Sequence, residues 1–274
     1  MYSPIQHKKT YDMKIKINPR YEAYRTFIAS LPRRFDREGE IIFRGRNVIK
    51  RFTATEGSGY QQVMIVKRYK RPNFFQKIAY TFFCKTKARR AYEHAEVLLD
   101  RSFLTPMPFA YIETRRFGLI DHCYFISDVD ESHPISERLN EPEEFDRTLA
   151  EEFARFAARL HQQGIIDVDL NSTNVLYRPV PTGYTGQGHY LFSLIDINRM
   201  HVYPKGTVPP LAACMENLTR FTGRMDVFGH VASAYAAARG WSDEMVPRLI
   251  KTKREHDRRW RRRKTFLHRF KRRK

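Results

Sequence analysis

Residues 160–174 read LHQQGIIDVDLNSTN, and residues 193–199 read SLIDINR. In the first stretch Asp169-Leu is followed by Asn174, and Asp196 comes 22 residues after Asn174. Two short apolar runs on either side of a Pro/Gly-rich loop predict a β-hairpin between these positions. The runs are Asn174–Tyr177 and Tyr190–Ile195. Such a hairpin returns Asp196 to the side of Asn174, so the three polar side chains should lie close together.

The order Asp-Leu, Asn and then a distant Asp suits phosphoryl transfer. Asp169 is expected to act as the catalytic base beside an acceptor hydroxyl. Asn174 and Asp196 are expected to hold Mg²⁺ on nucleotide phosphates, because Mg²⁺ prefers oxygen ligands. The pattern predicts a phosphotransferase that uses ATP and Mg²⁺.

The first half of the sequence supplies candidate nucleotide-binding residues. Lys67 ends the apolar run Val-Met-Ile-Val-Lys, a context typical of a lysine that binds nucleotide phosphates. Residues 87–100 repeat apolar side chains at helical spacing, and Glu93 on this helix is expected to pair with Lys67. Glu96 lies one turn further along the same face, so the choice between Glu93 and Glu96 stays open.

The predicted fold class is α+β, a two-lobed kinase-like fold with a strand-rich N-lobe carrying one main helix and a helical C-lobe. We assign residues 1–128 to the N-lobe, 129–250 to the C-lobe and 251–274 to a basic aromatic tail. Strands are predicted at Glu40–Phe43, Asn47–Phe52, Val63–Val66, Ala110–Glu113 and Cys123–Ser127, a turn at Thr53–Gly59, and helices at Lys87–Asp100, Glu143–His161 and Met225–Ala238.

The chain resembles the lipopolysaccharide kinase (Kdo/WaaP, InaA-like) family, a bacterial branch of the protein-kinase-like fold. The resemblance rests on six short motifs between about Asn47 and Arg220. They are Val-Lys67-Arg-Tyr, Lys87-Ala-Arg-Arg-Ala-Tyr-Glu93, Leu104-Thr-Pro-Met-Pro108, Leu160-His-Gln-Gln-Gly164, Asp169-Leu-Asn-Ser-Thr-Asn174 and Leu194-Ile-Asp-Ile-Asn-Arg199. The resemblance implies phosphorylation of an inner-core sugar of a lipopolysaccharide precursor, such as Kdo or heptose, at the inner face of the cytoplasmic membrane. It also implies the roles given above for Lys67, Glu93, Asp169, Asn174 and Asp196.

Several departures separate the sequence from regulated protein kinases. Asp167-Val168 replaces the usual His or Arg before the catalytic Asp, and Ile197-Asn198 replaces the usual Phe-Gly after the metal-binding Asp. Only Glu56-Gly-Ser-Gly59 offers a flexible phosphate cover before Lys67. These differences favour a kinase that acts on a small molecule or glycolipid. The role of Asp167 stays open.

The net charge is +20, and the tail holds much of it. Residues 251–274 contain fourteen Lys/Arg and two acids, interleaved with Trp260 and three apolar side chains, Phe266, Leu267 and Phe270. A second basic run lies between Lys67 and Arg90. Such charge attracts a polyanion, and the glycolipid substrate favours an anionic membrane surface over nucleic acid. The plainer interpretation is a solvated charge run that only keeps the protein soluble.

No stretch approaches the twenty apolar residues of a membrane span, and the N-terminal sequence lacks the apolar core of a signal peptide. The protein is therefore expected in the cytoplasm, peripheral at the membrane, with Cys84, Cys123 and Cys214 reduced.

Three other functions compete. A kinase-like protein that phosphorylates protein hydroxyls uses the same residues, and a non-catalytic protein can keep the fold and bind membrane or nucleic acid. Asp167-Val-Asp169 also resembles the Asp-x-Asp of haloacid-dehalogenase-type phosphatases, but that chemistry needs a parallel sheet fed by β-α units. Each site residue also has a structural alternative, such as a turn-forming Asp or Asn or a surface ion pair.

Overall fold

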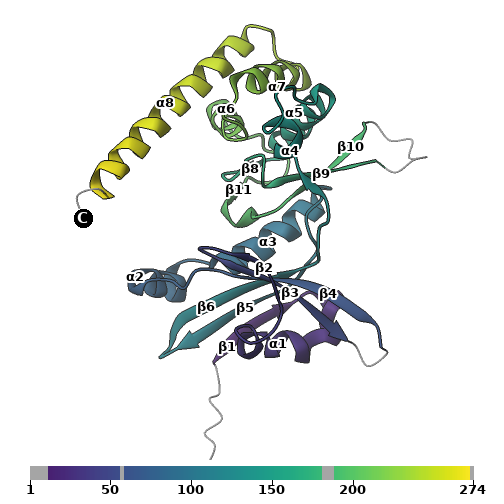
Figure 1. Cartoon of the computed structure of the whole chain (residues 1–274), viewed down its shortest axis with the longest axis vertical. Helices are drawn as coiled ribbons and strands as arrows, with labels where there is room; N and C mark the ends of the chain where they lie inside the picture. The colour runs from purple at the N-terminus through teal and green to yellow at the C-terminus, as the bar shows by residue number, and fades with distance from the viewer. Residues whose placement is uncertain (1–11, 56–58, 181–187, 272–274) are drawn as a thin grey trace, which may run out of the picture. The chain divides into compact units, whose positions relative to one another are not determined.

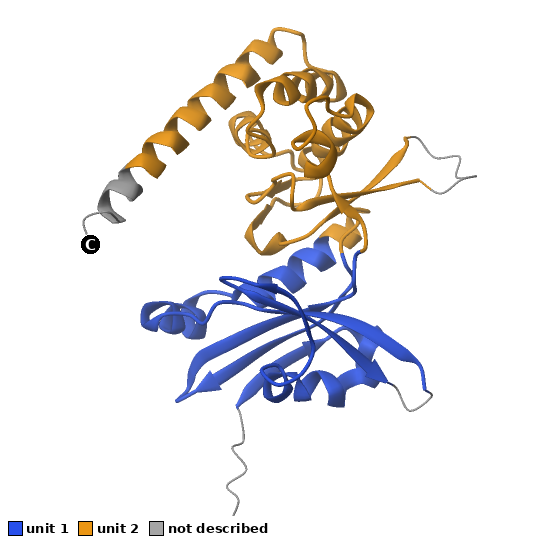
Figure 2. Ribbon diagram, viewed as in Figure 1, with its two compact units in different colours: residues 1–97, 106–130 blue, residues 98–105, 131–274 orange. Residues whose placement is uncertain are grey.

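The computed structural model describes residues 12–55, 59–180 and 188–271, with the side chains of the last range described through residue 265. The chain forms two compact units (Figure 2). Unit 1 contains residues 1–97 and 106–130, and unit 2 contains residues 98–105 and 131–274. The chain thus passes into unit 2 twice, the first time for the short segment 98–105.

Unit 1 is built on a six-stranded antiparallel sheet with the strand order β1-β5-β6-β4-β3-β2 (Figure 1). The strands are β1 (Met13–Ile17), β2 (Glu40–Arg44), β3 (Val48–Thr55), β4 (Gln61–Arg68), β5 (Pro108–Arg116) and β6 (Leu119–Ser127). The helices are η1 (Pro19–Tyr24), α1 (Arg25–Arg34), α2 (Phe74–Ile78), the π-helical turn η2 (Ala79–Phe83) and α3 (Lys87–Asp100).

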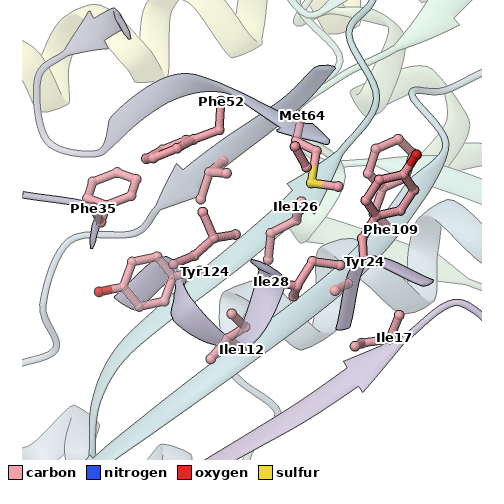
Figure 3. Packing of buried hydrophobic residues seen from close by; sticks show 14 residues of the cluster. Ile17, Tyr24, Ile28, Phe35, Phe52, Met64, Phe109, Ile112, Tyr124 and Ile126 are labelled. Atoms are coloured by element: carbon pink, nitrogen blue, oxygen red, sulfur yellow. The ribbon is translucent and has the colours of Figure 1, made fainter. Parts of the chain in front are cut away.

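The alternation of side chains along β5 and β6 gives the sheet two apolar faces. Ile112 on β5 and Tyr124 on β6 belong to a buried cluster that also contains Ile28 and Leu31 of α1. Figure 3 shows this packing around Phe35, Phe52 and Tyr124. The neighbouring residues Tyr111 and Cys123 point to the other face, where they pack with Ala88 and Tyr92 of α3. The helices α1 and α3 therefore belong to two separate cores of unit 1.

The predicted strands and the helix at residues 87–100 are confirmed, the helix with its predicted bounds. The turn expected from Thr53 begins later, because β3 continues to Thr55 and pairs there with Gln61. The strand β1 and the helix α1 were not predicted from the sequence. The predicted phosphate cover lies largely outside the described residues, since residues 56–58 are not among them.

Unit 2 combines helices with three short antiparallel pairings. The hairpin β9–β10 pairs with β7, and β8 pairs with β11, while α5 packs against α7. The elements are β7 (His133–Pro134), α4 (Ser136–Leu139), α5 (Arg147–Gln162), β8 (Ile165–Asp167), β9 (Val175–Pro179), β10 (Tyr190–Leu194), η3 (Ile197–Arg199), β11 (Met200–Val202), α6 (Leu211–Leu218), α7 (Met225–Ala238) and α8 (Met245–Lys271). The predicted hairpin and the helix at 225–238 are confirmed.

The helix expected from Glu143 begins four residues later, at Arg147. Asp146 sets this start, because its side chain accepts a hydrogen bond from the backbone N–H of Leu149 at 2.9 Å. After the helix, Gly164 takes a φ of +75°, a left-handed conformation that glycine adopts without a side-chain clash. The chain can then turn directly into β8 and the site that follows it.

Residues 251–271 of the basic tail belong to the long helix α8, which begins six residues before the tail boundary set from the sequence (Figure 1). Its first part packs on α6 and α7. Lys253 is buried, with its Nζ 2.7 Å from Asp257 and 5.9 Å from the centroid of the Phe228 ring. Arg259 pairs with Glu216 of α6 at 2.8 Å. Residues 245–259 are therefore part of the folded core of unit 2. Among the described residues, no helix has the length and apolar character to cross a membrane.

Candidate active site

Asp169 and Asn174 lie on the loop between β8 and β9 in unit 2. The Asn174 side-chain amide donates to the backbone carbonyl of Asp169 at 3.0 Å, which ties the two ends of the loop together. One carboxylate oxygen of Asp169 accepts a hydrogen bond from Arg199 Nη1 at 2.9 Å. Arg199 was part of a motif in the sequence, but no role was predicted for it. Its position three residues after Asp196 was the indication in the sequence that it would lie near the site.

Asp196 follows β10, and the hairpin returns it toward Asn174. The backbone N–H of Ile195 donates to the backbone carbonyl of Asn174 at 3.0 Å. Asp196 is the next residue after this contact. The Asp196 carboxylate accepts from Asn198 Nδ2 at 2.7 Å. Its backbone has φ +55° and ψ 36°, a left-handed conformation that a residue with a side chain adopts at a cost of about 1 kcal/mol. The structure brings Asp169, Asn174 and Asp196 together as expected, and their roles stay predictions.

Asp167 is fully buried at the end of β8, two residues before Asp169. Its Oδ1 accepts from the backbone N–H of Asp169 at 3.0 Å, whereas its Oδ2 has no hydrogen-bond partner among the described residues. Burial is the main cause that raises the pKa of Asp167, the charges of Asp169 and Asp196 add to it, and the hydrogen bond from Asp169 and the charge of Arg199 oppose it, so that the pKa is about 7. The sequence showed an extra acid here but could not show that it is buried.

This raised pKa predicts a pH-dependent stability. The unfolded chain releases the proton near the ordinary pKa of 3.8, whereas the folded protein keeps it up to about 7. The free energy of unfolding contributed by Asp167 therefore falls as pH rises through this window, by about 1.4 kcal/mol per pH unit. Asp167→Asn cannot titrate, so relative to the wild type it should gain stability over the same window. Urea unfolding of both proteins across the window measures the difference, and parallel pH profiles would contradict the assignment.

A chain of buried hydrogen bonds holds the carbonyl of Asp167. Arg239 donates to the Tyr235 hydroxyl at 2.7 Å, which lies 2.8 Å from His161 Nδ1. His161 Nε2 lies 2.9 Å from the Asn217 Oδ1, and Asn217 Nδ2 donates to the Asp167 carbonyl at 2.6 Å. Because Asn217 Oδ1 can only accept, His161 carries its proton on Nε2 and accepts from Tyr235 on Nδ1.

Burial lowers the pKa of His161 to about 4, so the ring is neutral and keeps this tautomer. His161, near the end of α5, thus anchors the loop through its hydrogen bonds. It acts on the site through Asn217, whose importance the sequence did not reveal.

Lys67 lies in unit 1, on β4. It stands opposite Ile49 of β3 and Phe125 of β6, so its side chain shares the face on which Phe125 packs beside α3. Its Nζ lies 5.3 Å from the centroid of the Tyr69 ring. Lys67 is half-buried on this face of the sheet, and its proposed contact with nucleotide phosphates stays a prediction.

Glu93 has other cationic partners in unit 1. Lys85 Nζ and Arg89 Nε each lie 2.8 Å from its carboxylate. Burial acts to raise the pKa of Glu93, but the hydrogen bonds from Lys85 and Arg89 outweigh it and leave the pKa below its ordinary value. The pairing of Glu93 with Lys67 stays a prediction. It would require Glu93 to exchange these partners, and Glu96, the other candidate, is exposed.

The oxygen atoms of unit 2 fit a hard cation such as Mg²⁺. Asp196 supplies a carboxylate, and Asn174 supplies an amide oxygen whose orientation is fixed because its nitrogen binds the Asp169 carbonyl. Mg²⁺ is commonly held by one or two protein ligands together with phosphate oxygens. In the described parts of the chain, no group of three or more His, Cys, Asp or Glu side chains could hold a metal ion by itself. Two protein ligands thus suit a cation that arrives with the nucleotide.

Comparison with known proteins confirms the predicted fold. A structure of WaaP in complex with acyl carrier protein matches with a TM-score of 0.56 and 15% sequence identity, over 89% of this chain and 98% of that chain. A Rio2 kinase complex from Chaetomium thermophilum matches with a TM-score of 0.44 and 14% identity, over 84% of this chain and 75% of that chain. No family model and no curated protein sequence matches the chain. The chain has the protein-kinase-like fold of WaaP, and at 15% identity this likeness shows the fold alone.

Proposed function

We propose that the protein is an ATP- and Mg²⁺-dependent kinase that phosphorylates a hydroxyl of an inner-core sugar, Kdo or heptose, of a lipopolysaccharide precursor. The observation that carries the proposal is the grouping of Asp169, Asn174 and Asp196 at one end of the unit 2 hairpin, in a chain with the fold of WaaP. The left-handed backbone of Asp196 supports a functional role for this residue. Strained backbone conformations persist where the surrounding structure enforces them, and they are found most often at active sites.

Each residue has a defined task in this reaction. Asp169 accepts the proton of the sugar hydroxyl, and Arg199 holds the carboxylate in position. The hydroxyl oxygen then bonds to the γ-phosphorus as the bond to ADP breaks. Asn174 and Asp196 would hold Mg²⁺, which would supply positive charge to the phosphates, and Lys67 would position the nucleotide. The hydrogen-bonded chain through His161 and Asn217 keeps the loop in place.

Mass spectrometry of lipid A–core material tests the substrate class. Incubation with the purified protein, ATP and Mg²⁺ should add the mass of one phosphate to the core oligosaccharide, and omission of Mg²⁺ should prevent it. Fragmentation locates the phosphate on Kdo or heptose. If the core material stays unmodified while the protein phosphorylates tyrosine or serine residues, the sugar assignment is wrong and the phosphotransferase assignment stands.

We further propose that the protein is cytoplasmic and binds the inner face of the cytoplasmic membrane through its basic tail. Beyond Arg259, α8 carries Arg261, Arg262, Arg263 and Lys264, all exposed, and Trp260 is 55% exposed. Each cation near an anionic surface contributes about 1 kcal/mol to binding.

A truncation of the tail should begin after the part of α8 that packs on unit 2. Removal of residues 251–274 would delete the buried Lys253, so a chain that ends at Arg259 is the better variant. In vesicle flotation this variant should lose salt-sensitive binding to anionic vesicles. Unchanged binding at low salt would rule out the tail as an anchor.

A further inference from the structure

Four phenylalanines are exposed within ten residues of unit 1. Phe74 and Phe75 of α2 are 64% and 80% exposed, and Phe82 and Phe83 of η2 are 67% and 81% exposed. We call residues 74–83 the aromatic turn (Figure 1). Isolated apolar residues on a surface are ordinary, but a cluster of exposed rings marks an interaction site.

The aromatic turn is fixed to the sheet by its polar side. Lys77 binds Asp121 of β6 at 2.7 Å, and the hydroxyl of Thr81 accepts from the backbone N–H of Ile120 at 3.0 Å. Lys77 and Thr81 are four residues apart and lie on one side of the turn. Because that side faces β6, the rings are held outward by the fold.

The surroundings of the aromatic turn are strongly basic. Residues 67–90 contain nine Lys/Arg and no Asp or Glu. Two carboxylates pair with this segment, and each of them binds two basic side chains. Asp121 binds both Arg71 and Lys77, and Glu93 binds both Lys85 and Arg89. Each of these clusters keeps a net positive charge beside the exposed rings.

We propose that the aromatic turn inserts into an anionic lipid bilayer, with the phenylalanine rings among the upper acyl chains and the basic residues on lipid phosphates. Rings flanked by cations are the chemistry of interfacial membrane segments. Several polar side chains in the turn, and Asn73 just before it, already have hydrogen-bond partners. Asn73 and Gln76 bond to each other's backbone as a capping box, and Thr81 donates to the carbonyl of Lys77 at 2.6 Å. The turn thus presents rings and charge, which suit a lipid surface better than a protein partner that needs directional hydrogen bonds.

This inference goes beyond the proposed function and does not depend on catalysis. It adds a second membrane contact in unit 1, separate from the tail of unit 2. Salt screens the cations of both contacts but does not screen ring insertion, so the part of the binding that comes from the rings of the aromatic turn should persist at high salt. Vesicle binding tests the inference, and phosphate transfer tests the proposed function, so either can fail alone.

Flotation of the full chain with vesicles of phosphatidylcholine and phosphatidylglycerol in equal parts is the first experiment. Phe75→Ser with Phe83→Ser removes the two most exposed rings of the turn. The double variant should bind about tenfold more weakly, and the defect should remain at high salt. Tyr60→Ser is the matched control, since Tyr60 is an aromatic of unit 1 that is 64% exposed and lies outside the turn. It should bind like the wild type.

Cys84 provides a second measurement without any loss of the rings. It is exposed and adjoins Phe83, whereas Cys123 and Cys214 are buried, so a thiol-reactive spin label should attach at Cys84. On addition of the same vesicles, the label should become more accessible to oxygen and less accessible to a water-soluble nickel complex.

Wild-type binding by the double variant would overturn the proposal, and so would a Cys84 label that stays in water on the vesicles. A third result would also overturn it. If light scattering shows that the wild type is a dimer and the double variant a monomer, the rings cover a second copy of the chain instead of lipid.

Discussion

Asp169→Asn should lower the rate of phosphate transfer about a thousandfold, while Mg²⁺-dependent nucleotide binding stays close to that of the wild type. The amide keeps the shape of the side chain and can still accept the hydrogen bond from Arg199. The variant therefore loses the base without losing the position of the loop. Initial rates of ADP release with lipid A–core acceptor measure the first quantity, and calorimetric titration with an ATP analogue measures the second.

Asp226→Asn is the matched control for this experiment. Asp226 also pairs with an arginine of unit 2, Arg224, on the first turn of α7, and it belongs to no part of the proposed site. This variant should transfer phosphate at the wild-type rate. Full turnover by Asp169→Asn would remove Asp169 from the reaction.

Asp196→Asn should weaken nucleotide binding in the presence of Mg²⁺ about a hundredfold, the equivalent of roughly 3 kcal/mol. Asparagine is the right replacement, because Asn tolerates the left-handed backbone at this position better than Ala. The substitution thus removes the charge and leaves the local conformation. Titration of the nucleotide with and without Mg²⁺ separates metal-dependent affinity from the rest.

Without Mg²⁺, the wild type and Asp196→Asn should bind the nucleotide with similar affinity. Asn198→Ala is a useful companion, since it removes the hydrogen bond to the Asp196 carboxylate but keeps the charge. Its affinity should fall less than that of Asp196→Asn. If both proteins show the same Mg²⁺ dependence as the wild type, Asp196 does not hold the metal.

The elements predicted correctly are helices and strands that are specified by residues close together in the sequence. The spacing of apolar residues gave the bounds of α3 and α7, and the runs beside the Pro/Gly-rich loop gave the β9–β10 hairpin. The hairpin in turn explains why Asp196 returns to Asn174, so the unit 2 part of the site followed from pattern and spacing. The likeness to WaaP confirms the fold that these elements suggested.

The rest depends on contacts that a linear pattern does not contain. Arg199 meets Asp169 across 30 residues, and Asn217 meets Asp167 across 50. The helical conformation of α8 was missed because about half of its residues are charged and the exposed side chains among its described residues are mostly basic. The partners of Glu93 were visible as nearby basic residues, but the sequence could not rank them against Lys67.

Along the chain of hydrogen bonds from Arg239 to the Asp167 carbonyl, each group donates to the next one. This fixed direction limits which amino-acid substitutions the chain of hydrogen bonds can accept. A change at Tyr235, His161 or Asn217 alone strands two buried groups, each at a cost of about 1–3 kcal/mol. An apolar replacement of the whole set leaves the Asp167 carbonyl and Arg239 without these partners, and Arg239 is only half-buried. Related sequences should therefore keep these three residues together or exchange them together, and chains with a single member altered should be rare.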